Sequence, residues 1–216
     1  MIILENVSKK FRTKGKPKVI VENVSLTIPD GARVGILGRN GAGKSTLLRM
    51  IAGIAAPDRG RVRRTKLVSW PLGFAGSFHS GLTGAQNARF VARIYGRDTQ
   101  ELLDYVEDFA ELGDYFNMPV RSYSSGMKAR LAFGVSMGIA FDCYLVDEIT
   151  AVGDTNFKRK AEAVFDTRLA KSDLIMISHS VPALRRLCDS GIVLSNGTLT
   201  YYQDIEDAIE VHEASM

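Results

Sequence analysis

The 216-residue sequence is poor in the residues that build disulfide scaffolds and membrane spans. Its two cysteines, Cys143 and Cys188, are far apart and show neither metal-site spacing nor a disulfide framework. Every apolar run is interrupted well before the roughly 18 residues that a membrane-spanning helix requires. The opening MIILENVSKK carries its charges after the apolar stretch, unlike a secretory signal. We therefore expect reduced thiols and a protein kept in the cytosol.

Internal repeats, a low-complexity tail and coiled-coil heptads are also missing from the sequence. Hydrophobic residues make up 45% of the chain, which at this length is enough for a substantial core. These properties favour one compact α/β domain, with or without a smaller subdomain, over a multidomain protein.

The net charge is only +4, but the basic residues are concentrated in two places. Residues 9 to 18 contain six Lys or Arg, and residues 59 to 66 contain five. Such runs usually mean a solvated hairpin or loop. Attraction to nucleotide phosphates or to an anionic membrane surface is the alternative for the first run.

A glycine-rich segment from Gly38 to Ser45 reads GRNGAGKS, and we call it the phosphate loop. Apolar residues precede and follow it, so it joins a predicted strand to a predicted helix. Glycines allow successive backbone N–H groups to surround a phosphate at the positive end of the helix. Lys44 reaches the terminal phosphates and Ser45 ligates Mg²⁺. The expected ATP-binding residues here are Gly38, Arg39, Asn40, Gly41, Ala42, Gly43, Lys44, Ser45 and Thr46.

A second motif, CYLVDE, spans residues 143 to 148. Its apolar residues predict a buried strand that places Asp147 near Mg²⁺ and Glu148 just beyond the strand end. There Glu148 polarises a water that attacks the γ-phosphate. A strand that ends in Asp-Glu is common by itself, but in combination with the phosphate loop it indicates hydrolysis rather than binding alone.

The surrounding pattern predicts an antiparallel start and a mostly parallel continuation. Strands at 2–7 and 19–28 flank the basic loop, and Thr83 with Gln86 forms a capping box that starts a helix to about Ile94. A second helix is expected from Thr99 to Leu112, with Gly113 as its stop. After residue 143 strands and helices alternate, as in a sheet covered on both faces. A hairpin with Asn196-Gly197 at its turn and a short helix follow.

The segment YSSGM (123 to 127), followed by Lys128-Ala129-Arg130, resembles the signature of ABC-transporter ATPases. Ser124, Gly126 and Arg130 match that family's Leu-Ser-Gly-Gly-Gln-x-x-Arg, whereas Tyr123, Ser125 and Met127 depart from it. Taken alone, Ser-Ser-Gly is an ordinary helix N-cap. The resemblance covers essentially the whole chain. It implies an α/β P-loop NTPase fold of the ABC type, with a mixed sheet, an N-terminal antiparallel part and a helical subdomain at about 77–138 within a single domain 1–216.

Further positions receive roles from the resemblance. Asp154 matches a loop that contacts the opposite subunit, and His179 matches the switch histidine that binds the γ-phosphate. Phe11 lies where the family has an aromatic that stacks on adenine. The family's glutamine between the core and the insert is missing, since Gln86 belongs to the capping box. Ser77, His79 or a water takes its place, and the sequence does not choose among them.

The resemblance also implies partners. Because one chain carries one phosphate loop and one signature, it should pair with a second copy around two ATP molecules. Integral membrane permease subunits dock on the family's helical insert, and we expect no nucleic acid partner. Trp70, Phe74 and Phe78 either line that docking groove or belong to the core.

Residues 69 to 96 resemble the ATPases of polysaccharide exporters, and the small size resembles the Gram-negative capsular group. The expected function is therefore ATP-driven export of a lipid-linked, acidic capsule polymer. The protein would act at the cytoplasmic face of the inner membrane, within a wider capsule-export envelope complex. O-antigen or teichoic-acid export and a soluble, non-transport ABC ATPase are the alternatives.

Overall fold

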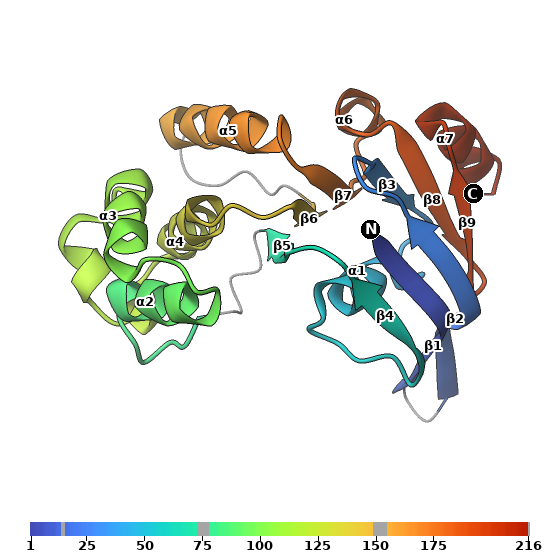
Figure 1. Ribbon diagram of the computed structural model, residues 1–216, viewed down its shortest axis with the longest axis horizontal. Helices are drawn as coiled ribbons and strands as arrows, with labels where there is room; N and C mark the ends of the chain where they lie inside the picture. Colours follow the sequence, from blue (N-terminus) through green and yellow to red (C-terminus); the bar gives the residue numbers. More distant parts are fainter. Residues whose placement is uncertain (14–15, 73–77, 149–154, 216) are drawn as a thin grey trace. The chain divides into compact units, whose positions relative to one another are not determined.

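The computed structural model describes residues 1–13, 16–72, 78–148 and 155–215, and within these the chain forms two compact units (Figure 1). The first unit contains Met1–Pro71, Phe141–Glu148 and Ser172–Met216. The second unit contains Leu72–Ala140 and Ile149–Lys171. It therefore includes the expected insert at 77–138 and an additional segment from later in the chain.

A three-stranded antiparallel sheet opens the first unit. It consists of β1 (Ile2–Thr13), β2 (Lys16–Ile28) and β4 (Arg59–Arg64), in the order β2-β1-β4. The predicted strands 2–7 and 19–28 were too short, because β1 and β2 extend through most of the basic run and pair as far as Thr13 and Lys16. Of the two alternatives for that run, the hairpin is confirmed. Lysine has a low strand propensity, and cross-strand pairing stabilises the longer strands.

The main sheet has six strands in the order β5-β6-β7-β3-β8-β9. Strands β3 (Arg33–Leu37), β6 (Cys143–Asp147), β7 (Asp173–Ile177) and β8 (Ser190–Ser195) pair in parallel, as predicted. Strand β9 (Thr198–Tyr202) is antiparallel to β8, and β5 (Val68–Leu72) lies at the other edge. The turn between β8 and β9 is at Asn196 and Gly197, which both have positive φ, at 48° and 82°. The mixed α/β architecture is confirmed.

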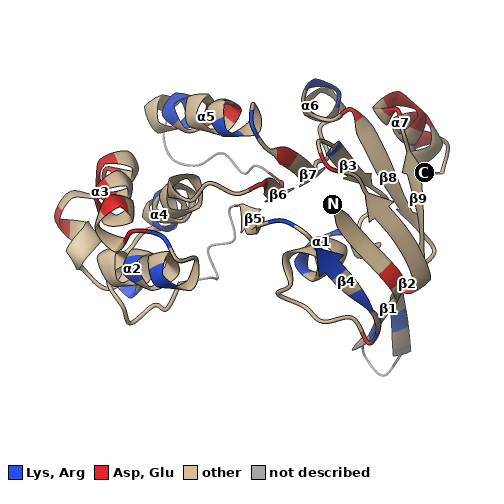
Figure 2. Cartoon of the chain, in the orientation of Figure 1, with Lys and Arg blue, Asp and Glu red and all other residues tan. Residues whose placement is uncertain are grey.

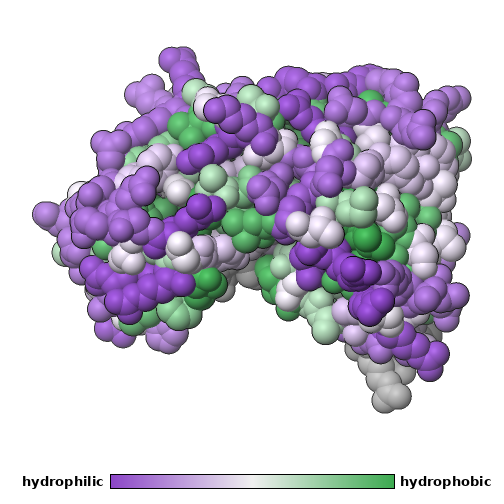
Figure 3. All heavy atoms as spheres, viewed as in Figure 1, coloured by the Kyte–Doolittle hydropathy of each residue, from purple (hydrophilic) through white to green (hydrophobic). Residues whose placement is uncertain are grey.

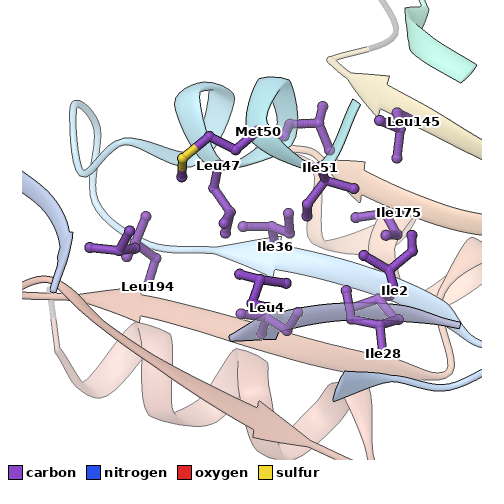
Figure 4. Packing of buried hydrophobic residues seen from close by; sticks show 14 of the residues in the cluster. Ile2, Leu4, Ile28, Ile36, Leu47, Met50, Ile51, Leu145, Ile175 and Leu194 are labelled. Atoms are coloured by element: carbon purple, nitrogen blue, oxygen red, sulfur yellow. The ribbon is translucent and has the colours of Figure 1, made fainter. Parts of the chain in front are cut away.

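Three helices complete the first unit: α1 (Lys44–Ala52), α6 (Val181–Leu187) and α7 (Ile205–Ala214). Apolar side chains from α1 and both sheets form one core, in which Leu4, Ile36 and Leu47 are at most 2% exposed (Figure 4). Burial of each such side chain contributes about 1.5–3 kcal/mol relative to exposure. This packing fixes the start of α1 against the strands that carry the other site residues.

The C-terminus of α1 is held by an arginine from β4. The Arg64 guanidinium donates to the Met50 carbonyl, 2.6 Å away, and to the Ile51 carbonyl, so a cation satisfies carbonyls at the negative end of the helix. The neighbouring Arg61 and Arg63 instead bind Glu5 on β1. Figure 2 shows β4 largely in blue, the colour of Lys and Arg.

The second unit is helical, with α2 (Gly84–Ile94), α3 (Thr99–Ala110), α4 (Ser125–Gly138) and α5 (Thr155–Leu169). Short 3-10 turns at Gly113–Asn117 and Val120–Ser122 join α3 to α4. The Phe109 ring lies at its centre, stacked on Phe133 at 5.9 Å and edge-to-face with Phe157 at 5.4 Å.

Two helix boundaries in the second unit can be compared with the prediction. The capping box is confirmed, since Thr83 Oγ1 accepts from the Gln86 N–H at 3.0 Å and Gln86 Oε1 accepts from the Thr83 N–H at 2.9 Å. Helix α3 ends at Ala110, two residues before the predicted Leu112. Glu111 takes the left-handed conformation at φ 52°, and its carboxylate binds Lys160 at 2.8 Å, which stabilises the earlier end.

The surface of the second unit is divided by charge. Helix α2 exposes arginines, including Arg89 and Arg93, whereas α3 exposes mainly carboxylates (Figure 2). Phe90 and Ile94 on α2 are also 60% and 61% exposed, and hydrophobic side chains reach the surface in this region (Figure 3). Among the helices of the described ranges, none is long and apolar enough to cross a membrane.

Candidate active site

The phosphate loop turns tightly between β3 and α1, and its glycines are required by the chain's own packing. Gly38 has φ 148° and Gly43 has φ 113°, which favour glycine. A Cβ on Gly38 would lie 2.5 Å from the Leu194 carbonyl oxygen, and one on Gly43 would lie 2.5 Å from Ile20 Cγ2. Gly43 is the N-cap of α1 and supplies no side-chain cap. The first N–H groups of α1 are therefore left for an anionic ligand.

Lys44 begins α1 and is only 8% exposed. Its ammonium donates to the carbonyl oxygens of Gly38 and Arg39, the latter at 3.2 Å. Burial lowers the pKa of Lys44, while the carboxylates of Glu148 and Asp147 oppose that shift. The lysine is thus oriented by the loop and lies within the field of both acidic groups.

Ser45 and Asp147 are brought together as the sequence predicted. The Ser45 hydroxyl donates to Asp147 Oδ1 at 3.2 Å, although 102 positions separate the two residues. Asp147 ends β6, whose other residues are buried. A hydroxyl and a carboxylate are hard oxygen donors, so the pair fits Mg²⁺, which takes few protein ligands and completes its shell with phosphate and water.

Glu148 lies one residue beyond β6 in the left-handed conformation, at φ 50°. Its N–H donates to the Ile177 carbonyl at 3.0 Å, which ties the residue to the end of β7. Its Oε1 lies 2.9 Å from His179 Nε2, and the two side chains are 49% and 57% exposed. The arrangement joins a carboxylate and an imidazole at a place that water reaches.

Phe11 lies on the part of β1 that the sequence analysis placed in a loop, and it is 44% exposed. The Lys9 ammonium is 5.3 Å from the centre of its ring and also pairs with Asp58 at 2.8 Å. The Phe11 ring is therefore partly exposed, with the Lys9 ammonium over it.

The signature residues lie in the second unit, at the start of α4. Ser124 is the N-cap, and its hydroxyl accepts from the Met127 N–H at 3.2 Å. A Cβ on Gly126 would meet only Ser124 Oγ, at 3.9 Å, so nothing in the described chain requires glycine there. Arg130 lies 4.6 Å above the Phe157 ring and 3.8 Å from Glu111, within the packing of its own unit. Asp154 lies outside the described residues.

Comparison with known proteins identifies the fold and the family. The family model described as "ABC transporter" matches residues 21–151, more than half of the chain. The chain belongs to the ABC transporter family. The dimeric structure of the ATP-binding cassette MJ0796 in a post-hydrolysis state, bound to ADP and Pi, has a TM-score of 0.75 at 20% identity and covers 95% of this chain and 99% of that one. At that identity the likeness supports the shared fold.

Relatives with greater sequence similarity are polysaccharide transport proteins by name. The chain is 46% identical to the polysialic acid transport ATP-binding protein KpsT of Escherichia coli, covering 99% of this chain and 96% of that protein. It is 44% identical to the capsule polysaccharide export ATP-binding protein CtrD of Neisseria meningitidis serogroup B, covering 99% of both. The O-antigen export system ATP-binding protein RfbB of Klebsiella pneumoniae is 34% identical over 94% of this chain and 84% of that protein.

The loop before α2 depends on a residue that the sequence analysis missed in this ABC ATPase. Asn87 on α2 is 3% exposed, and its amide donates to the carbonyls of His79 and Thr83 at 3.2 and 2.9 Å. Its Oδ1 accepts from the His79 N–H at 2.9 Å. A polar residue on the buried face of a predicted helix was the available signal. His79 is itself exposed, and Ser77, the other expected substitute for the family's glutamine, lies outside the described residues.

Two of the three aromatic residues proposed for a docking groove, Trp70 and Phe78, lie in the described part of the chain. Trp70 is half-buried and packs edge-to-face on Phe141, with ring centroids 5.4 Å apart. Phe78 is half-buried as well, and Phe74 lies outside the described residues. The packing of Trp70 is that of a core aromatic.

Both cysteines are free and buried in the first unit. Burial raises the pKa of the Cys143 thiol and of the Cys188 thiol to about 12 each. Burial therefore keeps both thiols protonated in the folded protein at neutral pH.

Proposed function

We propose that this protein is the ATP-hydrolysing subunit of an exporter that carries a lipid-linked, acidic capsular polysaccharide across the bacterial inner membrane. The observation that carries the substrate class is the difference in similarity among its relatives. Identity is 46% and 44%, along nearly whole chains, to proteins named for polysialic acid and capsule polysaccharide, but 34% to one named for O-antigen export.

ATP would be held through its phosphates by the first unit. The phosphate loop from Gly38 to Thr46 would surround them with backbone N–H groups, and Lys44 would move its ammonium from the loop carbonyls to the terminal phosphates. Phe11 would stack on the adenine. Ser45 and Asp147 would hold Mg²⁺, which supplies charge neutralisation of the phosphate oxygens.

Glu148 is the proposed general base. Water attacks the γ-phosphorus, the bond from that phosphorus to the bridging oxygen breaks, and the carboxylate accepts the water's proton as ADP and phosphate form. His179 is within hydrogen-bond distance of this carboxylate, and with Nε2 protonated it would donate to Glu148 and orient it. The same imidazole would contact the γ-phosphate.

A second copy would complete each site. Helix α4 presents Ser124, Gly126 and its positive N-terminal end, and Gly126 leaves open space for close approach. We propose that these groups bind the γ-phosphate held by the other copy, with Asp154 also at the interface. The dimeric form of the solved cassette supports this assembly.

The membrane partners would be integral permease subunits, and the working location the cytoplasmic face of the inner membrane. Export would be driven by opening and closing of the ATP-bound dimer, within the wider capsule-export envelope complex. Trp70, Phe74 and Phe78 remain a proposed docking surface, although the packing of Trp70 on Phe141 favours the core alternative.

The test is co-expression with the permease in capsule-producing cells that lack their own export ATPase. The wild-type chain should restore polymer at the cell surface and co-purify with an integral membrane protein. Glu148→Gln should retain MgATP binding and form a dimer that persists with ATP, while hydrolysis falls by about 10²–10⁴-fold. Glu107→Gln, an exposed change on α3, is the matched control and should behave as wild type.

Three outcomes would contradict the proposal. Hydrolysis by Glu148→Gln at the wild-type rate would remove Glu148 as the base. If the chain restored export of O-antigen but not of capsule polymer, the proposed substrate would be wrong and O-antigen would take its place. Co-purification with ribosomes or DNA instead of a membrane protein would favour a soluble ABC ATPase.

A further inference from the structure

The face of β2 that covers the phosphate loop carries a lysine to which the sequence analysis gave no role. Lys18 is the register partner of Phe11 in the antiparallel pairing of β1 with β2. Residues directly opposite each other in such a pair project to the same face, with Cβ atoms about 4.5–5.5 Å apart. Lys18 and the exposed Phe11 ring are therefore neighbours on one surface.

Strand β2 meets the phosphate loop at two points. A Cβ on Gly43 would lie 2.5 Å from Ile20 Cγ2, and a Cβ on Gly41 would lie 3.5 Å from the Lys18 ammonium nitrogen. Ile20 is an extra residue in the ladder, because Val19 and Val21 pair with the consecutive residues Lys10 and Lys9. Ile20 thus packs against the base of the loop, while Lys18 extends its ammonium beside Gly41.

The charge of Lys18 is uncompensated within the described part of the chain. Its side chain is exposed, and no described carboxylate pairs with it, whereas the nearby Lys9 binds Asp58 at 2.8 Å. An ammonium beside the positive N-terminal end of α1 is electrostatically unfavourable unless an anion lies between them. A negatively charged ligand at this position would therefore be electrostatically favourable.

We propose that Lys18 binds the α-phosphate of the nucleotide, between the adenine on Phe11 and the terminal phosphates at Lys44. This inference rests on the proposed ATP-binding function. The α-phosphate is common to ATP and ADP, so the contact contributes to the affinity for both nucleotides and does not sense hydrolysis. Lys18 is accordingly a binding residue, distinct from Glu148 and His179, which act at the γ-phosphate.

The experiment compares the affinities of Lys18→Met and the wild type for MgATP and MgADP by calorimetric titration. Methionine keeps much of the side-chain length and removes the charge. Both dissociation constants should rise by the same factor, about tenfold, as for loss of one charge-assisted hydrogen bond. The salt dependence of both should also become shallower, because one fewer charge contributes. Lys18→Arg should restore most of the affinity.

The matched control is Lys10→Met. Lys10 is exposed and lies in the same basic run, but it alternates with Lys9 and Phe11 and so projects to the other face of β1. Its affinities should equal those of the wild type. Circular dichroism melting of each variant separates loss of binding from loss of folding.

Unchanged affinity of Lys18→Met for both nucleotides would overturn the inference and leave the ATPase proposal intact. A loss confined to MgATP would also overturn it, by placing the ammonium at the γ-phosphate. Failure of the folded wild-type chain to bind either nucleotide would instead remove the function on which the inference rests.

Discussion

The N-terminus of α1, in the first unit, follows a glycine loop and has no side-chain cap, whereas that of α4, in the second unit, is capped by the Ser124 hydroxyl. The glycines differ in the same way. A Cβ on Gly38 would collide with the backbone of Leu194, but one on Gly126 would make only an ordinary contact with Ser124 Oγ.

The two positions carry glycine for different reasons. Gly38 is required by the chain's own fold, because the loop must pass close to β8 with a positive φ. Gly126 is not required by the described residues of its own chain. The proposed contact with a second copy would give its small size a role, and the variants below test that contact.

The largest effect should come from Gly38→Ala. The added Cβ would meet the Leu194 carbonyl oxygen at 2.5 Å in a backbone conformation unfavourable for alanine. We expect the free energy of unfolding, measured with urea, to fall by about 3 kcal/mol or more, with loss of MgATP binding. An unfolding midpoint close to that of the wild type would show that the loop relaxes, and would break the comparison with Gly126.

Nucleotide should protect the first unit, which holds both cysteines. At pH 8 iodoacetamide should label Cys143 and Cys188 only after opening, because burial raises both thiol pKa values to about 12 and exposure returns them toward 9.0. MgATP at 100 times its dissociation constant stabilises the bound form by about 2.7 kcal/mol, so labelling should slow by about 100-fold. Mass spectrometry gives both rates.

The pH dependence of that labelling supplies its control. Between pH 7 and 8 the labelling rate should rise about tenfold. Both pH values are below the ordinary pKa of an exposed thiol, so the thiolate fraction grows in proportion to the hydroxide concentration. Fast labelling in the native state would mean that the thiols are accessible without opening. A labelling rate that MgATP does not change would mean that the nucleotide is not held by the unit that contains the phosphate loop.

Ser124→Ala should have an intermediate effect. Loss of the N-cap hydroxyl leaves the Met127 N–H without its acceptor and should lower the free energy of unfolding by about 1 kcal/mol. Ser125→Ala, one residue on and also exposed, is the matched control and should cost far less. Equal losses in the two variants, measured by urea unfolding, would mean that the cap does not stabilise α4.

Gly126→Ala should have the smallest effect on stability and the opposite sign. Alanine favours a helix over glycine, so the free energy of unfolding should rise by up to about 1 kcal/mol. In a Glu148→Gln background, however, the change should abolish the ATP-dependent dimer seen by size-exclusion chromatography. A dimer that forms normally would mean that Gly126 is not at the interface between copies.

The sequence predicted the parts of the fold and site that depend on local pattern. The start of α1 after the phosphate loop, the buried strand before Asp147 and the capping box at Thr83 each carry their signal within a few residues. The mostly parallel sheet followed from the alternation of strands and helices after residue 143, and the structure confirms it.

The features that were missed depend on distant contacts. Lys18 beside Gly41 and Asn87 beneath its loop are each defined by neighbours that the local sequence does not specify. The early end of α3 was missed for the same reason, since Lys160 binds Glu111 from another helix. The full length of β1 and β2 was missed because lysine-rich segments rarely form strands without a paired partner.

Strand β4 lies at the edge of its sheet, where its outer backbone groups would otherwise offer a template for pairing with another chain. We expect the exposed arginines of this strand to oppose such pairing by charge. Replacing Arg59 and Arg61 with apolar residues would leave the core untouched and yet favour fibrous aggregation. Strongly screening salt would act in the same direction.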